Sequence, residues 1–402
     1  MYKNKYIKII GSPKIFSFTV MWMMVLVFIG TLVQRDIGLY AAQQEYFSSW
    51  FKWVFFIPLP SGKLTMLVMF INLSCYFIRP NILHKSKLGI TTTHSGIILM
   101  LLGGAITSFY SREGSVVIEE GKTANYYEDY YAKELIIIDS SKPEYDFFTT
   151  FNSKLLYENS ILNHDSFPFQ IEILDYFINC KPSSRIYAGD ENFKGMSKNF
   201  FLQEIKPEKE YEQNISGVIY EVTGTDAEDG IYINYVGQPI TQTVTVDDDE
   251  YMVILRRERT YLPFLLSLVD FKKVMHPGTN IAKSYSSDVN LIENNVPRKV
   301  LISMNEPLRH REYTFYQASF IEDGLTQTSV LATVKNYGRL FPYISTIIMC
   351  IGLIYHMLFI ASTQCNITSQ SNDESKTKYR IICHAVYITS VNRPIVPLPH
   401  EL

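Results

Sequence analysis

Four long apolar runs most strongly constrain how this chain can fold. Residues 15–34 contain no Lys, Arg, Asp or Glu, and as a helix they reach ~30 Å, the thickness of one bilayer core. Similar runs cover residues 64–78, 88–110 and 341–360. A cleaved signal peptide is the alternative for the first run. The apolar region of a signal peptide is shorter and is followed by small residues at the cleavage site, whereas this run ends in Leu-Val-Gln. The sequence therefore predicts four transmembrane helices.

Positive charges orient these spans. They gather before the first run, between the second and third, and after the fourth: Lys3, Lys5, Lys8, Lys14, Arg79, Lys85, Lys87, Lys376, Lys378, Arg380 and Arg393. With four spans, all three segments lie on one side, and Lys and Arg near spans favour the cytoplasm. Both termini are then cytoplasmic, residues 361–402 form a polar cytoplasmic tail, and residues 111–340 form a separate extracytoplasmic domain.

The loop between the first two runs, residues 35–63, is rich in aromatic residues. They are Tyr46, Phe47, Trp50, Phe51, Trp53, Phe55 and Phe56. Their density fits a helix lying at the membrane interface, where rings contact lipid and polar edges contact water. Packing against the outer domain is the alternative, and the two are compatible.

The outer domain is predicted to be β-rich. Short runs of Val and Ile, flanked by Gly, Asp, Asn and Ser, are typical of an antiparallel sandwich or barrel. Residues 168–176 (PFQIEILDY) and 263–271 (PFLLSLVDF) share one pattern of Phe and aliphatic residues that suits a core strand. This similarity indicates two related β-lobes, with chance likeness of two core strands as the alternative.

Composition excludes several function classes. The net charge of −3 argues against a basic nucleic-acid binder, so no nucleic-acid partner is expected. The five cysteines include no CxxC, which excludes a zinc ribbon, a thioredoxin-type motif and covalent haem attachment through CxxCH. Cys180 is the only cysteine of residues 111–340, and we expect it to be a buried small hydrophobe rather than a redox thiol.

Two histidines lie inside the predicted spans. His94 is ~9 Å from the cytoplasmic end of the third span, and His356 is ~6 Å from that end of the fourth. Neutral imidazole is a good axial ligand for haem iron. Thr91 lies one turn from His94, and Gly96, Gly103 and Gly104 allow a neighbouring helix or a flat macrocycle to approach. An interhelical hydrogen bond is the alternative for His94, and contact with interfacial water for His356.

The order of several segments resembles the ResB-like proteins of the system II cytochrome c maturation pathway. The resemblance spans residues 12–359. It is carried by GTLVQ at 30–34, YFSSWF at 46–51, LGITTTHSG at 88–96, EEG at 119–121, LVDF at 268–271, HPGT at 276–279, MNEPL at 304–308 and YTFYQASF at 313–320.

This resemblance implies a haem-handling subunit of the bacterial cytoplasmic membrane. With a ResC/CcsA-like partner, such proteins move haem outward and present it to apocytochrome c, and a thioredoxin-like thiol reductant accompanies the pathway. His94 matches the family's intramembrane histidine, an axial ligand to haem b shared with the partner subunit. The family draws its second ligand from that partner, which leaves His356 as a local possibility. The chain would then be part of a holocytochrome c synthase-type complex and not catalytic alone.

A competing interpretation is a non-enzymatic membrane scaffold or transporter component whose outer domain binds a peptide or another subunit. Co-purified b-type haem distinguishes the two, because a scaffold needs none. A receptor would need a cytoplasmic signalling domain, and residues 361–402 are too few for one.

Overall fold

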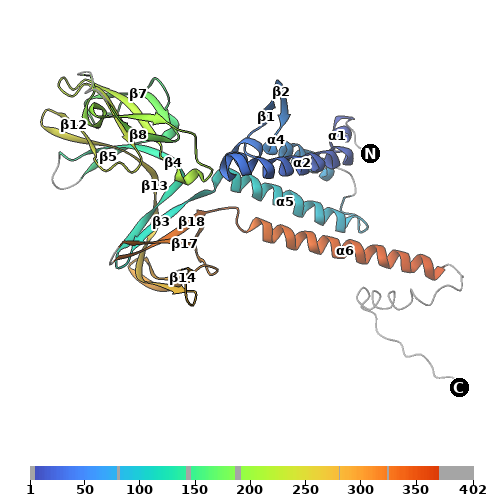
Figure 1. Cartoon of the computed structure of the whole chain (residues 1–402). Helices are drawn as coiled ribbons and strands as arrows, with labels where there is room; N and C mark the ends of the chain where they lie inside the picture. The colour runs from blue at the N-terminus through green and yellow to red at the C-terminus, as the bar shows by residue number, and fades with distance from the viewer. Residues whose placement is uncertain are drawn as a thin grey trace. The chain divides into compact units, whose positions relative to one another are not determined.

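A computed structural model describes residues 5–78, 82–141, 146–185, 192–279, 281–323 and 326–370. The chain divides into two compact units (Figure 1). The helical unit comprises Met1–Phe28, Tyr46–Tyr110 and Tyr337–Leu402. The β unit comprises Ile29–Glu45 and Ser111–Asn336.

The apolar runs form helices, as expected. The helices are α1 (Lys5–Ile10), α2 (Pro13–Ile37), α3 (Leu39–Tyr46), α4 (Gly62–Phe77), α5 (Leu88–Tyr110) and α6 (Phe341–Gln370). Among the described residues, α2, α5 and α6 are long and apolar enough to cross a membrane. The 16 residues of α4 reach only ~24 Å by helical rise, short of a ~30 Å bilayer core. The chain is thus a membrane protein with three membrane-length helices and one shorter apolar helix.

The C-terminal helix is longer than the predicted span. It continues past Ile360, so the start of the predicted tail is helical, and residues 371–402 lie outside the described residues. Of the cations that orient the spans, six also lie outside them: Lys3, Arg79, Lys376, Lys378, Arg380 and Arg393.

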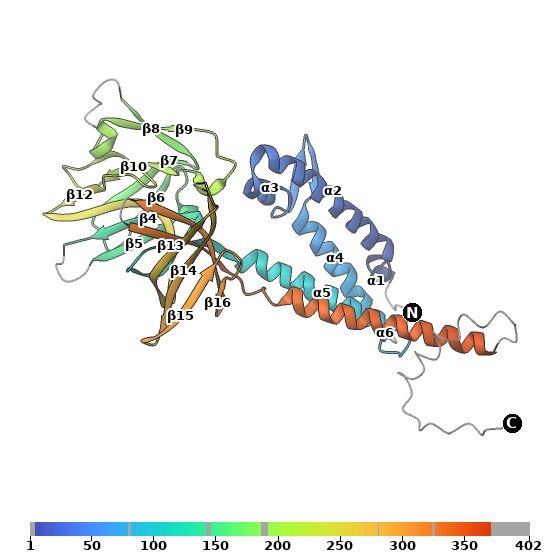
Figure 2. The same cartoon turned by 60° about the horizontal axis from the view of Figure 1, so that its bottom comes forward.

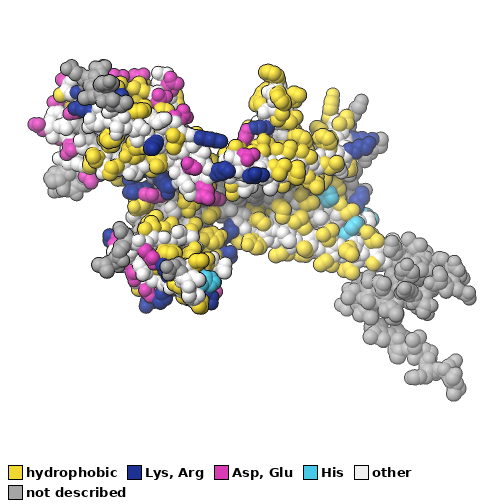
Figure 3. Space-filling model, in the orientation of Figure 1, with side chains coloured by type: hydrophobic (Ala, Val, Ile, Leu, Met, Phe, Trp, Pro, Cys, Tyr) yellow, Lys and Arg dark blue, Asp and Glu magenta, His cyan; other side chains and the backbone are white. Residues whose placement is uncertain are grey.

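The surface of the helical unit is apolar. Large hydrophobic side chains on α2 and α6 are exposed, among them Phe18, Met21, Phe28, Ile347 and Met357. Figure 3 shows this hydrophobic covering over the helices. A surface of this extent needs lipid or another protein against it, because contiguous apolar patches are unfavourable in water.

The aromatic loop does not form the interfacial helix predicted from its composition. Between α2 and α4 only α3 is helical; Phe51 and Trp53 lie in β1 (Phe51–Val54), and Phe55 and Phe56 form the turn to β2 (Ile57–Pro60). The reason is the alternation of Pro58 and Pro60 with aliphatic residues. Proline inside a helix removes a backbone donor and clashes with the preceding turn, whereas an edge strand tolerates it.

The β unit confirms the predicted β-rich domain, and its named strands pair antiparallel throughout. The strands are β3 (Arg112–Glu119), β4 (Thr123–Asp139), β5 (Phe147–Asn152), β6 (Ser160–Leu162), β7 (Gln170–Phe177), β8 (Cys180–Ser184), β9 (Phe200–Glu204), β10 (Gly217–Thr223), β11 (Gly230–Tyr235), β12 (Gln242–Val246), β13 (Asp249–Met275), β14 (Ala282–Glu293), β15 (Val296–Ser303), β16 (Leu308–His310), β17 (Tyr313–Asp323) and β18 (Thr326–Lys335). Short 3-10 turns cover Ser153–Leu155, Gly195–Lys198 and Tyr211–Gln213.

One large sheet organises this unit. Its order is β15-β14-β13-β4-β3-β18-β17-β16, with β12 and β5 added to the long strands β13 and β4. Figure 2 shows β14 and β15 beside β13. A second sheet has the order β11-β10-β7-β6, and β8 pairs with β9. Because β15 also contacts β16 and β17, the large sheet curls around its own interior.

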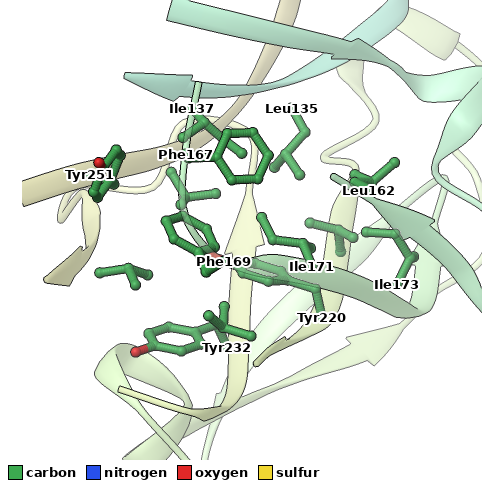
Figure 4. Close-up of a cluster of buried hydrophobic side chains, with 14 of the residues drawn as sticks. Leu135, Ile137, Leu162, Phe167, Phe169, Ile171, Ile173, Tyr220, Tyr232 and Tyr251 are labelled. Atoms are coloured by element: carbon green, nitrogen blue, oxygen red, sulfur yellow. The ribbon is translucent and has the colours of Figure 1, made fainter. Parts of the chain in front are cut away.

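The β unit has two large hydrophobic cores beside a smaller one around Cys180, and each large core contains one copy of the repeated pattern. The first core holds Phe169, Ile171 and Ile173, from β7 and the loop just before it (Figure 4). The second holds the matching residues of β13, which are Phe264, Leu266 and Leu268. Both segments are therefore core strands with the same alternate residues buried, as the pattern predicts. Their descent from one duplicated lobe stays an interpretation.

The segment Ile29–Glu45 belongs to the β unit through aromatic contacts. The ring of Tyr40 in α3 stacks on Tyr131 of β4, with 3.9 Å between centroids, and also contacts Tyr211. Gly38 adopts φ +85, and a Cβ there would lie 2.0 Å from the carbonyl oxygen of Lys209. Only glycine allows so close a backbone approach in that conformation.

A buried lysine lies next to this aromatic contact. The side chain of Asp129 accepts hydrogen bonds from the backbone N–H groups of Tyr131 and Ala132, where the pairing of β4 with β13 shifts register. Lys133 follows, is 3% exposed, and donates through Nζ to the carbonyl oxygens of Tyr130 and Tyr131. Burial, with the nearby Arg257 charge, lowers the pKa of Lys133 to about 8, although Asp129 opposes this shift.

This lysine should make stability depend on pH. Between about pH 8 and about pH 10.5 the unfolded chain holds the proton that folded Lys133 has lost, so the free energy of unfolding should rise with pH, by at most about 3 kcal/mol. Lys133→Met should flatten this rise, and the same change at the exposed Lys154 should not. Denaturant unfolding followed by tyrosine near-ultraviolet circular dichroism measures the slope. If the free energy of unfolding rises with pH equally steeply in Lys133→Met, Lys133 is not the cause of the rise.

Candidate functional site

A stripe of glycines fixes which face of α5 meets α6. Gly89, Gly96 and Gly103 recur every seven residues. A Cβ on Gly89 would lie 2.7 Å from the backbone nitrogen of His356, and one on Gly96 would lie 2.9 Å from the carbonyl oxygen of Ser345. Small residues of this kind let membrane helices approach closely. The helix α6 therefore covers this face.

His94 lies on another face of the same helix. At ~100° per residue, its position is ~140° around α5 from Gly89. Its ring stacks on Tyr76 of α4, with 4.4 Å between centroids and 21° between planes. His94 thus points toward α4 and away from α6.

The hydrogen bonding of His94 determines its tautomer. Nδ1 lies 2.7 Å from the carbonyl oxygen of Ile90, one turn earlier. Because a carbonyl can only accept, Nδ1 carries the proton and donates it. In the neutral tautomer with Nδ1–H, the lone pair on Nε2 is available for a ligand bond. Metal-bound histidines are commonly oriented in this way by a hydrogen bond from the other ring nitrogen.

Tyr76 is itself held in place. The hydroxyl of Thr91 donates to the carbonyl oxygen of Ile82 at 2.8 Å. The hydroxyl of Tyr76 lies 3.2 Å from the same Thr91 oxygen, so Tyr76 donates this second bond. The chain Tyr76–Thr91–Ile82 ties α4, α5 and their connecting loop together beside the His94 ring.

His94 borders a cavity of about 480 Å³ within the helical unit. Its lining comes from the turn between α1 and α2, from α4, and from the start of α5: Gly11, Pro13, Phe16, Asn72, Leu73, Tyr76, Ile82, Lys87, Ile90, His94 and Ile97. Among the described residues of this lining, Lys87 is the one cation. The amide of Asn72 donates to the carbonyl oxygens of Ile10 and Ser12 and closes one side. The volume is in the range of cofactor sites.

The structure does not bring His356 to this cavity. The backbone nitrogen and Cβ of His356 lie against Gly89, on the face of α5 that meets α6. Its Nδ1 is buried without a hydrogen-bond partner among the described residues. The two intramembrane histidines therefore lie on different sides of α5. Of the glycines predicted to admit a helix or a macrocycle, Gly96 and Gly103 meet α6, and Gly104 has nothing within 4 Å.

Cys180 matches its expected environment. It is 1% exposed in a small core with Leu202 and Ile233. Burial raises the pKa of its thiol to about 11, so the thiol is protonated at neutral pH. Among the described residues, no cluster of three or more His, Cys, Asp or Glu could hold a metal ion.

Sequence reasoning missed two contributors to the cavity, Asn72 and Tyr76. Both carry polar groups and are four positions apart in a mainly apolar helix, so they share one face of α4. Their four-residue spacing in the sequence was the signal that could have identified a polar face on this helix. Which neighbouring helix this face would meet depended on packing that the sequence does not display.

Comparison with known proteins shows two similarities in sequence. Residues 236–335 match the model of the ResB-like family. Protein NrfI of Wolinella succinogenes is 23% identical over 274 residues, which cover 66% of this chain and 27% of that protein. Residues 236–335 of this chain are therefore ResB-like. The predicted resemblance is thereby confirmed.

The segment that matches the ResB-like family has a definite place in the fold. It begins just after β11 and ends with β18, and it includes the segments 268–271, 276–279, 304–308 and 313–320. His94 lies outside it, so the role of His94 rests on the geometry of the cavity. The chain aligns with little more than a quarter of the length of NrfI.

Proposed function

We propose that this chain handles haem b during cytochrome c biogenesis, with Nε2 of His94 as an axial ligand to the iron. The observation that carries the proposal is the His94 ring itself. Its Nδ1–H is fixed on Ile90, its face is held by Tyr76, and it borders the cavity. An imidazole held in one tautomer beside a cofactor-sized, largely apolar space suits iron ligation better than a simple helix contact.

The residues around the cavity fit haem in three ways. The aliphatic and aromatic lining suits a flat macrocycle, and the Nε2 lone pair suits its iron. Lys87 supplies a positive charge that suits haem carboxylates. When bound, haem would supply an iron that binds imidazole nitrogen. The protein's own part is to orient His94, exclude water from its ring and neutralise anionic charge.

The second axial ligand is proposed to come from a partner subunit. Within the part of the chain that the structure describes, His94 is the only histidine that lines the cavity, and His356 lies on the other side of α5. A ResC/CcsA-like membrane protein would then complete the site and move haem outward. Apocytochrome c would receive the haem, with a thioredoxin-like reductant keeping its thiols available. No catalytic residue is assigned to this chain.

The proposed topology has four spans in the bacterial cytoplasmic membrane, with α4 as the short second span. Both termini are cytoplasmic, and residues 111–340 lie outside the cytoplasm. Reporter fusions at Ser111 and Gln370 should report opposite sides, because α6 separates them. Both reporters on one side would contradict this arrangement.

Co-purification tests the function directly. The full chain, expressed with its partner subunit, should retain b-type haem with a low-spin spectrum. The alternative of a membrane scaffold that binds a peptide or subunit needs no haem. A complex that assembles fully and supports cytochrome c maturation without bound haem would refute haem handling by this chain.

Tyr76 provides a finer prediction. Tyr76→Leu removes both the stacking on His94 and the bond to Thr91, so the ring should lose its orientation and the haem absorption band should shift or weaken. Tyr76→Phe keeps the ring and should be nearly normal. Absorption spectra and reduction potentials of the two variants measure this. Equal spectra in both variants and the wild type would exclude a positioning role for Tyr76.

A further inference from the structure

The hairpin β1–β2 presents a concentrated apolar surface. Phe55 and Phe56 at its tip are each 93% exposed, and Trp53 and Ile57 are more than half exposed. The segment 50–61 contains one lysine and no acidic residue. Figure 3 shows the hairpin, labelled in Figure 1, as a hydrophobic projection from the helical unit.

The turn of the hairpin has a bulky aromatic residue, Phe55, in a backbone conformation that is unusual for it. Phe55 has φ +54, a conformation that two-residue hairpin turns normally give to Gly, Asn or Asp. A bulky aromatic residue is strained there. Strain of this kind persists only where the surrounding structure holds it, and it clusters at functional positions. Phe55 therefore serves something other than the turn.

The prolines of β2 determine what can lie against its edge. The register pairs Pro58 with Trp53 and Pro60 with Phe51. These are the pairs without ladder hydrogen bonds, in which backbone N–H groups would point away from the partner strand. Proline has no N–H, so the outer edge of β2 offers no donor at either position. Pairing of a further strand with this edge is therefore disfavoured, and fewer backbone groups of β2 need hydrogen bonds from water.

The base of the hairpin contacts α2 at its tenth residue, Trp22, and the chain just after the hairpin lies near the last turn of α5. Trp22 donates from Nε1 to the carbonyl oxygen of Pro60 at 2.8 Å, and Ser61 donates to that of Trp50. Lys63, one residue into α4, places its ammonium group 5.5 Å from the ring of Phe109 in the last turn of α5. With 23 residues, α5 spans ~34 Å, so its last turn lies at the membrane–water boundary.

We infer that the hairpin β1–β2 is an interfacial anchor, whose tip residues Phe55 and Phe56 insert between lipid headgroups and acyl chains at the C-terminal end of α5. Trp and Phe rings are suited to this layer, and Lys52 suits lipid phosphates. The inference is independent of haem. It also places the aromatic residues at the membrane interface, as their composition suggested, but on a hairpin and not on a helix.

Fluorescence quenching in lipid nanodiscs tests the anchor in the full chain. The chain has three tryptophans, and the difference between wild type and Trp53→Phe isolates the contribution of Trp53. Phosphatidylcholine brominated near the glycerol should quench Trp53 more than lipid brominated near the methyl end. The double variant Phe55→Ser, Phe56→Ser should lose most of this quenching.

A matched control removes exposed apolar side chains elsewhere. Tyr157→Ser with Ile161→Ser changes two residues of the β unit that are 62% and 56% exposed, and it should leave Trp53 quenching unchanged. A Trp53 contribution that neither brominated lipid quenches would overturn the anchor. If aqueous acrylamide also fails to quench it, protein covers the hairpin instead of lipid.

Discussion

Replacing His94 with glycine should abolish cytochrome c assembly while α5 still forms. The change removes the Nε2 ligand and leaves an imidazole-sized space beside Tyr76 and the cavity. Added imidazole should enter that space and restore part of the assembly. The measurement is the amount of holocytochrome c in cells grown with and without imidazole.

The alternative role for His94 predicts a much smaller effect. If it only contributes a helix–helix contact, the loss is ~0.6 kcal/mol on average, and imidazole has no iron to bind. His356→Gly is the matched control within the membrane. With a partner-derived second ligand, this variant should keep its haem; collapse of the haem absorption in the isolated chain would instead support a His94–His356 pair. Normal assembly in His94→Gly would defeat the ligand assignment.

Adding a single methyl group at Gly89 should strongly destabilise the helical unit. The Cβ of Gly89→Ala would lie 2.7 Å from the His356 nitrogen and 2.8 Å from the Gly352 oxygen, and both are backbone atoms that cannot turn aside. The two helices must separate. Overpacking of this kind costs about 1–3 kcal/mol. Thermal unfolding of the full chain in detergent measures the loss.

Gly104→Ala is the control for this change. Gly104 lies on the same helix with nothing within 4 Å of its missing Cβ. It should therefore tolerate alanine, which also favours the helix by up to about 1 kcal/mol. Equal stability of the two variants would show that α6 does not pack on the glycine stripe as described.

The sequence predicted the helices and the β unit because both depend on local patterns. Uncharged runs of sufficient length form α2, α5 and α6, and alternating apolar residues form β7 and β13. The aromatic hairpin was wrongly expected to be helical. Aromatic density was weighed there above the two prolines, although proline is the stronger constraint on the backbone.

The site was predicted only in part. His94 stands out as an ionisable residue in an apolar run, but its orientation depends on where α4 and α6 pack. The spacing of Gly89, Gly96 and Gly103 already indicates one packed face of α5, with His94 off that face. The roles of Tyr76 and Asn72 arise from contacts between helices, which a single sequence does not reveal.

Nitrogen hyperfine spectroscopy of the haem tests the central claim most directly. The full chain, grown with isotopically labelled histidine, would be combined with an unlabelled partner subunit and haem. The iron spectrum should show coupling to one labelled nitrogen, and this coupling should vanish in His94→Gly but persist in His356→Gly. A labelled coupling that survives the loss of His94, or the absence of any coupling in the wild type, would contradict ligation by His94.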